Sequence, residues 1–187
     1  MSGHGHIDPS NKKIALLIAI LALILAFSET LAKGTQTSAL SYNIEASNLW
    51  SFFQAKTVRM TTVRTAMEAA EIKLTGAKAP ESREILKKQI NDWKKTAARY
   101  DSEPETQEGR KELMSRAKSA EKKREQSMAA YHHFELASAA LQIAIVLASA
   151  EIITGVMALA WISGGLGVIG LAFNLIGYFA PLAIHLF

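Results

Sequence analysis

The sequence predicts an all-α integral membrane protein with three transmembrane helices and a long extramembrane helical hairpin, coiled-coil-like, between the first and the second. The chain of 187 residues is 49% hydrophobic, with a mean hydropathy of +0.11. Its apolar residues gather in two blocks, 14–31 and 136–187, and all but two of the 21 Lys and Arg residues lie between them. Because these blocks need a non-aqueous solvent, a secreted disulfide scaffold, a nucleotide-binding α/β domain and a disordered protein are excluded.

The first apolar block predicts a transmembrane helix over residues 14–32, after a polar, flexible tail over residues 1–13. The run from Ile14 to Phe27 is IALLIAILALILAF, and about 18 residues of helix span roughly 27 Å, close to the thickness of the hydrocarbon core. The alternative is a cleaved signal peptide, because a basic start and the sequence Thr30-Leu31-Ala32 loosely fit that pattern. Glu29 fits poorly just before such a cut.

The second apolar block predicts two further spans, 136–162 and 165–187. The first of them contains Glu151 as its only charged residue, and the second contains no Asp, Glu, Lys or Arg. The tripeptide Ser163-Gly164-Gly165 between them predicts a tight turn, since glycine and small polar residues favour turns. The two spans are therefore expected to form a hairpin within the bilayer.

Small residues recur in all three spans at alternating three- and four-residue spacing, which places them on one face of each helix. Such a seam lets helix backbones approach closely, so it predicts packing within or between subunits. The alternative is a substrate path lined by the same faces. The seam residues are Ala19, Ala22, Ala26, Ala144, Ala148, Gly155, Gly167, Gly170 and Gly177.

Three polar residues within the spans are functional candidates, Glu29, Glu151 and Asn174, because polar and ionisable groups are costly in lipid. Glu29 is expected to pair with Lys33, four residues later, and to lie toward the opposite leaflet from Glu151. Glu151 is the better candidate, since no basic residue lies within a turn of it. The alternative for Glu151 is an interhelical hydrogen bond to Asn174, Thr154 or Gln142.

The charged middle of the chain, residues 33–133, predicts a helical hairpin stalk. A stripe with alternating spacing of four and three residues runs from Ala39 to Leu74 and predicts one long helix with a coiled-coil seam. Pro80 suits the first turn of a second helix, and the acidic segment 101–109 with its proline breaks that helix. A third helix is expected from Arg110 into the second span.

Self-association is expected because the stripe includes Lys56 and several alanines, so an antiparallel pair of helices would bury little apolar area. The aromatic cluster of Trp50, Phe52 and Phe53 also exceeds what one partner helix covers. The residues expected at an oligomer or stalk interface are Trp50, Phe53, Met60, Val63, Met67 and Trp93.

The basic residues of the middle segment alternate with acids, which is typical of a solvated helical face and disfavours nucleic acid as a partner. The run Lys122, Lys123 and Arg124 lies shortly before the second span and is expected to contact anionic lipid headgroups. Lys12 and Lys13 favour a cytoplasmic N-terminus, but more Lys and Arg flank the spans on the side of the middle segment. The sequence therefore predicts a cytoplasmic middle domain.

Nothing in the sequence favours an enzyme, and we expect no cofactor. Cysteine is absent, and no Gly-rich phosphate loop, nucleophile elbow or paired-carboxylate motif occurs. His4 and His6 in the tail would bind metal only incidentally. His132 and Glu135 have the spacing of one ligand pair, which is half a metal site.

Three strings carry a resemblance to a known family: Asn48-Leu-Trp50-Ser-Phe-Phe53-Gln54-Ala55-Lys56, Leu141–Ala150 and Gly164–Ala172. With them the chain resembles an uncharacterised bacterial membrane-protein family, domain of unknown function 4337. The resemblance implies the bacterial cell membrane and a three-span helical fold, and it supplies no activity. The expected function is a homo-oligomeric assembly that acts as a scaffold or binds a protein partner. The alternative is a channel or transporter subunit in which Glu151 and the Gly/Asn seam of the third span line a pathway.

Overall fold

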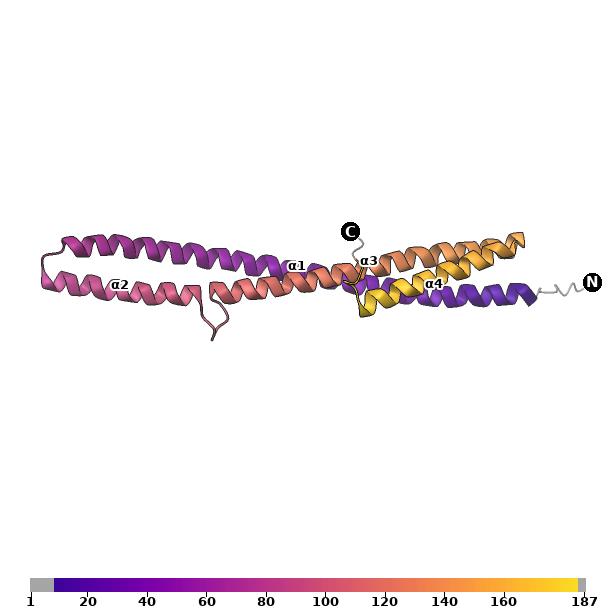
Figure 1. Ribbon diagram of the computed structural model, residues 1–187, viewed down its shortest axis with the longest axis horizontal. Coiled ribbons are helices and arrows are strands. Elements are labelled where there is room, and N and C mark those ends of the chain that lie inside the picture. Colours follow the sequence, from indigo (N-terminus) through magenta and orange to yellow (C-terminus); the bar gives the residue numbers. More distant parts are fainter. Residues whose placement is uncertain (1–8, 185–187) are drawn as a thin grey trace, which may run out of the picture. The chain divides into compact units, whose positions relative to one another are not determined.

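A computed structural model describes the backbone of residues 9–184 and the side chains from Lys12 onward (Figure 1). This part of the chain forms four helices and no strand: α1 (Pro9–Gly76), α2 (Pro80–Asp101), α3 (Arg110–Thr154) and α4 (Met157–Phe179). The all-α prediction is confirmed. The chain forms two compact units, and α1 and α3 each contribute to both. The apolar unit contains the chain up to Leu40 and from Lys123 onward, and the hairpin unit is Ser41–Lys122.

Helix α1 continues without a break through residues 32 and 33, the predicted boundary between the first span and the stalk. Gly34 stays helical, because one glycine inside a helix costs only about 1 kcal/mol. The hydroxyls of Thr37 and Ser38 donate to the carbonyls of Lys33 and Gly34, one turn earlier, and are satisfied inside the helix. The helix also begins at Pro9, so residues 9–13, which were predicted to belong to the tail, are helical. His4 and His6 lie outside the described residues.

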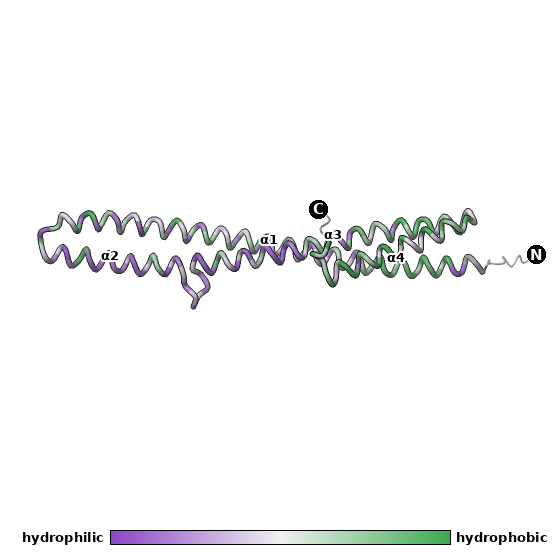
Figure 2. The backbone as a smooth tube through the Cα atoms, in the orientation of Figure 1, coloured by the Kyte–Doolittle hydropathy of each residue, from purple (hydrophilic) through white to green (hydrophobic). Residues whose placement is uncertain are grey.

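Three helices within the described chain are long and apolar enough to cross a membrane: α1, α3 and α4. Figure 2 shows the hydrophobic residues concentrated along α4 and along the parts of α1 and α3 that belong to the apolar unit. Many of their large apolar side chains are exposed, including Leu23, Phe27, Val146, Trp161 and Val168. A face of this kind is more apolar than the surface of a soluble monomer.

The turn between α3 and α4 is not at Ser163-Gly164-Gly165, and that prediction is wrong. The turn lies at Gly155 and Val156, where Gly155 has a φ of +70°, a left-handed conformation that favours glycine after a helix end. Ser163 is helical and fully buried, and its Oγ donates to the carbonyl of Ala144 at 2.7 Å. The apolar helices are therefore 136–154 and Met157–Phe179 instead of 136–162 and 165–187.

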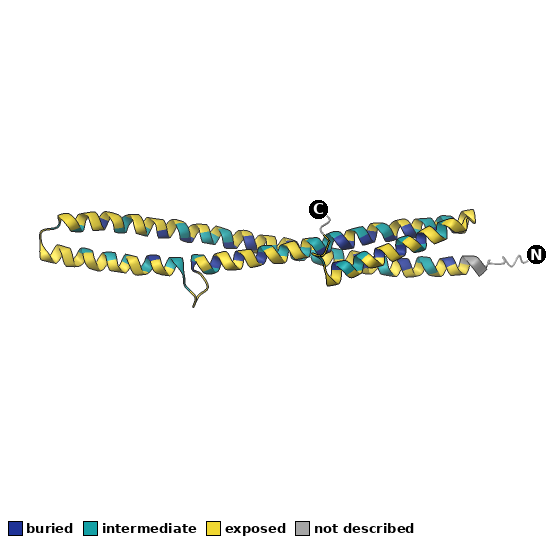
Figure 3. Cartoon of the chain, in the orientation of Figure 1, coloured by how far each residue is buried: buried dark blue, intermediate teal, exposed yellow. Residues whose placement is uncertain are grey.

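The hairpin unit confirms the inward stripe of α1. Ala46 and Leu49 form a core with Leu113, Ala117 and Ala120 of α3, against which Trp50, Phe52 and Phe53 pack. Figure 3 shows how buried and exposed positions alternate along these helices.

The predicted breaks around α2 also hold, since it begins at Pro80 and ends at Asp101. Ile85 of α2 is 62% exposed. The inner face of α2 is formed by less exposed residues at helical spacing, Leu86, Ile90 and Trp93. Ile85 lies off this face, because one residue turns a helix by about 100°.

Candidate functional site

Asn174 of α4 is bonded to Ser28 of α1 inside the apolar unit. The Oγ of Ser28 donates to Oδ1 of Asn174 at 2.8 Å, and Nδ2 of Asn174 donates to the carbonyl of Gly170 at 3.2 Å. Ser28 is fully buried, so its hydroxyl would be costly without this partner. The sequence did not single out Ser28. The only signal for it is a hydroxyl at the end of an apolar run.

Glu29 pairs with a different residue from the one predicted. Its Oε1 accepts a hydrogen bond from Nε2 of Gln142 at 3.2 Å, which links α1 to α3. Among the described side chains, the ion pairs within 4 Å do not include Glu29 with Lys33, so that prediction is wrong. The helix–helix bond satisfies the carboxylate across the bundle.

Glu151 is only 4% exposed, and its Oε2 has no hydrogen-bond partner among the described residues. The three partners expected for it are bonded elsewhere: Asn174 to Ser28, Gln142 to Glu29, and the hydroxyl of Thr154 to the carbonyl of Ala150. With the turn at Gly155, Glu151 also lies in the last turn of α3. The structure does not bring Glu29, Glu151 and Asn174 into one site.

The small-residue seams differ in their surroundings. Ala144 and Ala148 of α3 are fully buried, and Gly167, Gly170 and Gly177 of α4 are buried, so these seams pack inside the subunit. A Cβ at Gly167 would lie 2.6 Å from a methyl carbon of Leu21, and one at Gly177 would lie 2.9 Å from Cβ of His133. In contrast, Gly155 and the α1 residues Ala19, Ala22 and Ala26 are exposed, so the seam of α1 is not buried by the described part of its own chain.

His133 is buried in the apolar unit, and no role was predicted for it. One of its ring nitrogens, Nε2, lies 3.1 Å from the carbonyl oxygen of Pro181, and the ring stacks on Phe173. In the expected pair, Nδ1 of His132 lies 3.8 Å from Oε2 of Glu135. Within the described chain, no group of three or more His, Asp or Glu side chains could hold a metal ion.

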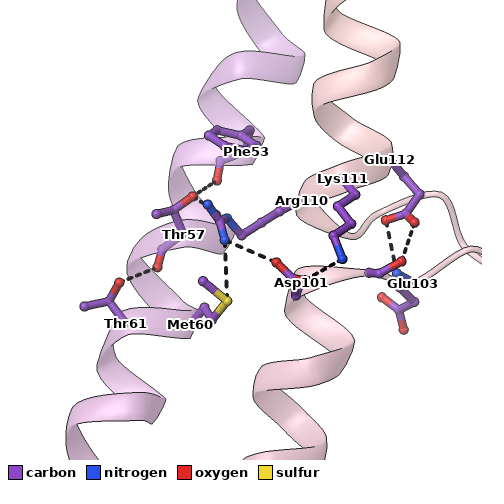
Figure 4. Close-up of polar contacts among 10 residues, drawn as sticks. Phe53, Thr57, Met60, Thr61, Asp101, Glu103, Arg110, Lys111 and Glu112 are labelled. Atoms are coloured by element: carbon purple, nitrogen blue, oxygen red, sulfur yellow. Dashed lines mark hydrogen bonds and ion pairs between the residues drawn. The ribbon is translucent and has the colours of Figure 1, made fainter.

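A polar cluster joins the three helices of the hairpin unit (Figure 4). Arg110, the first residue of α3, donates from Nε to Oγ1 of Thr57 at 2.9 Å and forms an ion pair with Asp101 at 3.3 Å. Its guanidinium also lies 5.1 Å from the ring centre of Phe53, a cation–π contact. This one side chain therefore fixes the start of α3 against α1 and against the end of α2.

Lys56 is the one cation of the inward stripe of α1, and its surroundings explain why it is tolerated there. The residue is 6% exposed, and its Nζ lies 3.8 Å from carboxylate oxygens of Glu103 and Glu108. The ammonium also lies 5.4 Å from the ring centres of Phe52 and Tyr100. A buried charge persists only where it is paired, so Lys56 holds the segment that follows α2 against α1.

The carboxylates of this cluster are stabilised in their ionised form. The hydroxyl of Ser102 donates to Oε1 of Glu112, and the backbone N–H of Glu103 donates to Oε2. The bond from Ser102 is the main reason that the pKa of Glu112 lies below its usual range. A hydrogen bond from Lys111 likewise lowers the pKa of Asp101.

We expect acid to weaken the hairpin unit. Because both carboxyls have a lower pKa in the folded state, their contribution to stability is present above about pH 4 and is lost as the pH falls through the folded-state pKa values. Urea unfolding of this unit should therefore occur at lower urea at pH 3 than at pH 7. The double variant Asp101→Asn, Glu112→Gln should reduce that difference, and an undiminished difference would contradict the assignment.

Of the residues expected at lipid headgroups, Lys122 and Lys123 are exposed and Arg124 is half-buried. Of the expected interface residues, Met60 is buried, while Trp50, Phe53, Val63, Met67 and Trp93 are half-buried on the inner side of the hairpin unit. Headgroup contact stays a prediction. The interface residues pack within the chain itself.

The fold and its polar contacts define an all-α chain in which three helices are long and apolar enough to cross a membrane, with helix–helix hydrogen bonds inside the apolar unit. The family described as Domain of unknown function (DUF4337) matches residues 10–180, and the chain belongs to this family. No curated protein and no solved structure matches the chain.

Proposed function

We propose that this protein is a non-enzymatic, multi-pass protein of the bacterial inner membrane that forms a homo-oligomeric helical assembly, acting as a scaffold or binding a protein partner. The observation that carries the proposal is the uncovered apolar face of α1, α3 and α4, with Phe27, Val146 and Trp161 among its exposed residues. In lipid these side chains need no protein cover. In water, a surface of this kind would aggregate.

The exposed seam of α1 supports assembly. Ala19, Ala22 and Ala26 face away from their own chain, and small residues on a lipid-facing helix favour close contact with another helix. The sequence contains no Gly-rich phosphate loop, nucleophile elbow or paired-carboxylate motif. A binding or scaffolding role requires no catalytic motif and no cofactor, and we therefore favour it.

In the proposed orientation the hairpin unit lies in the cytoplasm, because the Lys and Arg residues near the predicted spans are concentrated in the segment between the first span and the second. Since the chain has no cysteine, single-cysteine variants test this directly. In right-side-out vesicles, a membrane-impermeant maleimide should label Val156→Cys at the turn but should label Ser82→Cys only after permeabilisation. The reverse labelling would contradict the orientation and leave the helical architecture intact.

A channel or transporter subunit is the second candidate. The observation that favours it is the buried carboxyl of Glu151, whose Oε2 has no hydrogen-bond partner among the described residues. If Glu151 lies on a pathway, proteoliposomes should conduct ions, and Glu151→Gln should reduce the flux at least several-fold. Glu29→Gln serves as the matched control, because Glu29 is bonded to Gln142. Absence of flux, or equal flux in both variants, would remove this candidate.

A further inference from the structure

Within the hairpin unit, α1 carries a second stripe of uncharged residues, which lies on an exposed side of the helix. The stripe is Ile44, Asn48, Ser51, Ala55, Val58, Thr62, Thr65, Ala69 and Ile72, and every one of these residues is exposed. Ile44, Val58 and Ile72 are 53%, 65% and 73% exposed. We call this set the outer seam. Every charged residue of this part of α1 lies off the outer seam: Glu45, Lys56, Arg59, Arg64, Glu68, Glu71 and Lys73.

The outer seam lies on the opposite side of α1 from the inner stripe. Ile44 precedes the buried Ala46 by two residues, and two residues turn a helix by about 200°. The inner stripe is covered by α2 and α3 of the same chain, for example through Leu49 against Leu113. The outer seam is therefore left for a partner outside the chain.

The spacing of the outer seam is that of a coiled coil. Ile44, Ser51, Val58, Thr65 and Ile72 are seven residues apart, and Asn48, Ala55, Thr62 and Ala69 fall between them. The seam alternates by four and three residues over about 42 Å of helix. A partner must be a helix of similar length and the same period, and the α1 helix of a second copy meets both requirements.

The charges beside the outer seam fit two α1 helices side by side in parallel. Glu68 and Lys73 flank the seam on opposite sides, five residues apart, which is the spacing of the ion pairs across a parallel coiled coil. Each copy then offers Glu68 to Lys73 of the other copy. An antiparallel pair in the matching register would instead place Arg59 against Arg59.

We propose that the outer seam of α1 binds the outer seam of a second copy, with the two helices parallel. The proposal rests on the proposed function, because insertion of every copy into the membrane in one orientation makes their α1 helices parallel. The seam is rich in Ala, Ser and Thr, so it buries less apolar area than a leucine zipper. Anchoring in one bilayer raises the effective concentration of the helices and compensates for that.

Disulfide crosslinking of the full chain in proteoliposomes tests the seam. The variants are Ile44→Cys and Ile72→Cys, each alone, because a parallel pair brings identical seam positions within the roughly 5.5–6 Å between Cα atoms that a disulfide needs. Mild oxidation should give mainly covalent dimers in both. Glu71→Cys is the matched control, since Glu71 is exposed and adjacent to Ile72 but faces away from the seam, and it should stay largely monomeric.

Four results would overturn the proposal. If Glu71→Cys crosslinked as strongly as Ile72→Cys, the outer seam would not be the contact between the two copies. Dimers that form only when Ile44→Cys and Ile72→Cys are mixed would show antiparallel helices. Absence of dimers in a preparation whose native mass is oligomeric would reject the seam and leave the proposed assembly standing, whereas a monomeric native mass would reject the assembly itself.

Discussion

Replacing Gly170 with leucine is expected to destabilise the apolar unit by about 1–3 kcal/mol or more, the usual effect of overpacking. A Cβ at Gly170 would lie 2.8 Å from Cγ of Leu141 and 3.2 Å from the carbonyl oxygen of Ala137. The backbone of α3 cannot yield without moving the whole helix, so α4 must separate from α3. Thermal unfolding of the full chain in mild detergent should show a clear fall in Tm.

Gly165→Leu is the matched control, because Gly165 lies in the same helix and a Cβ there meets no atom within 4 Å. Its Tm should stay close to that of the unmodified chain. If both variants lost equal stability, the close contact of α4 with α3 at Gly170 would be refuted.

Leu113→Ala should cost the hairpin unit about 2–5 kcal/mol, the range for removing a buried leucine side chain. Leu113 is fully buried in the core with Ala46 and Leu49. Ala46, Ala117 and Ala120, its neighbours in that core, have no side-chain atoms beyond Cβ that could extend into the cavity. Amide hydrogen exchange should accelerate in peptides from α2 and from the part of α1 that belongs to the hairpin unit.

Met114→Ala is the control for that substitution. Met114 is adjacent to Leu113 but 36% exposed, so its truncation should change exchange little. Exchange that is unchanged by Leu113→Ala would show that this core does not hold the hairpin unit together.

The sequence predicts those helix ends that depend on local chemistry. Pro80 and the segment after Asp101 mark the ends of α2 correctly, because proline restricts the backbone wherever it occurs. The turn at Gly155 was missed, since Ser163-Gly164-Gly165 is locally the stronger turn signal. Packing decides between the two positions: Ser163 bonds to Ala144, which requires residue 163 to be inside a helix facing α3.

The candidate site was predicted less well than the fold, because its contacts depend on which residues meet across helices. The partners of Glu29 and Asn174 are Gln142 and Ser28, and no spacing in one sequence reveals that register. The uncharged positions of the outer seam are readable in the sequence. Which of the two stripes on α1 faces its own hairpin is decided only by the packing of Leu113 and its neighbours.

The mass of the intact particle in mild detergent, measured by native mass spectrometry, tests the central claim most directly. A homo-oligomeric membrane assembly requires a particle that contains a fixed whole-number multiple of the 20.4 kDa chain. The expected result is one such multiple that persists on dilution. A particle with the mass of a single chain under the same conditions would contradict the proposed assembly.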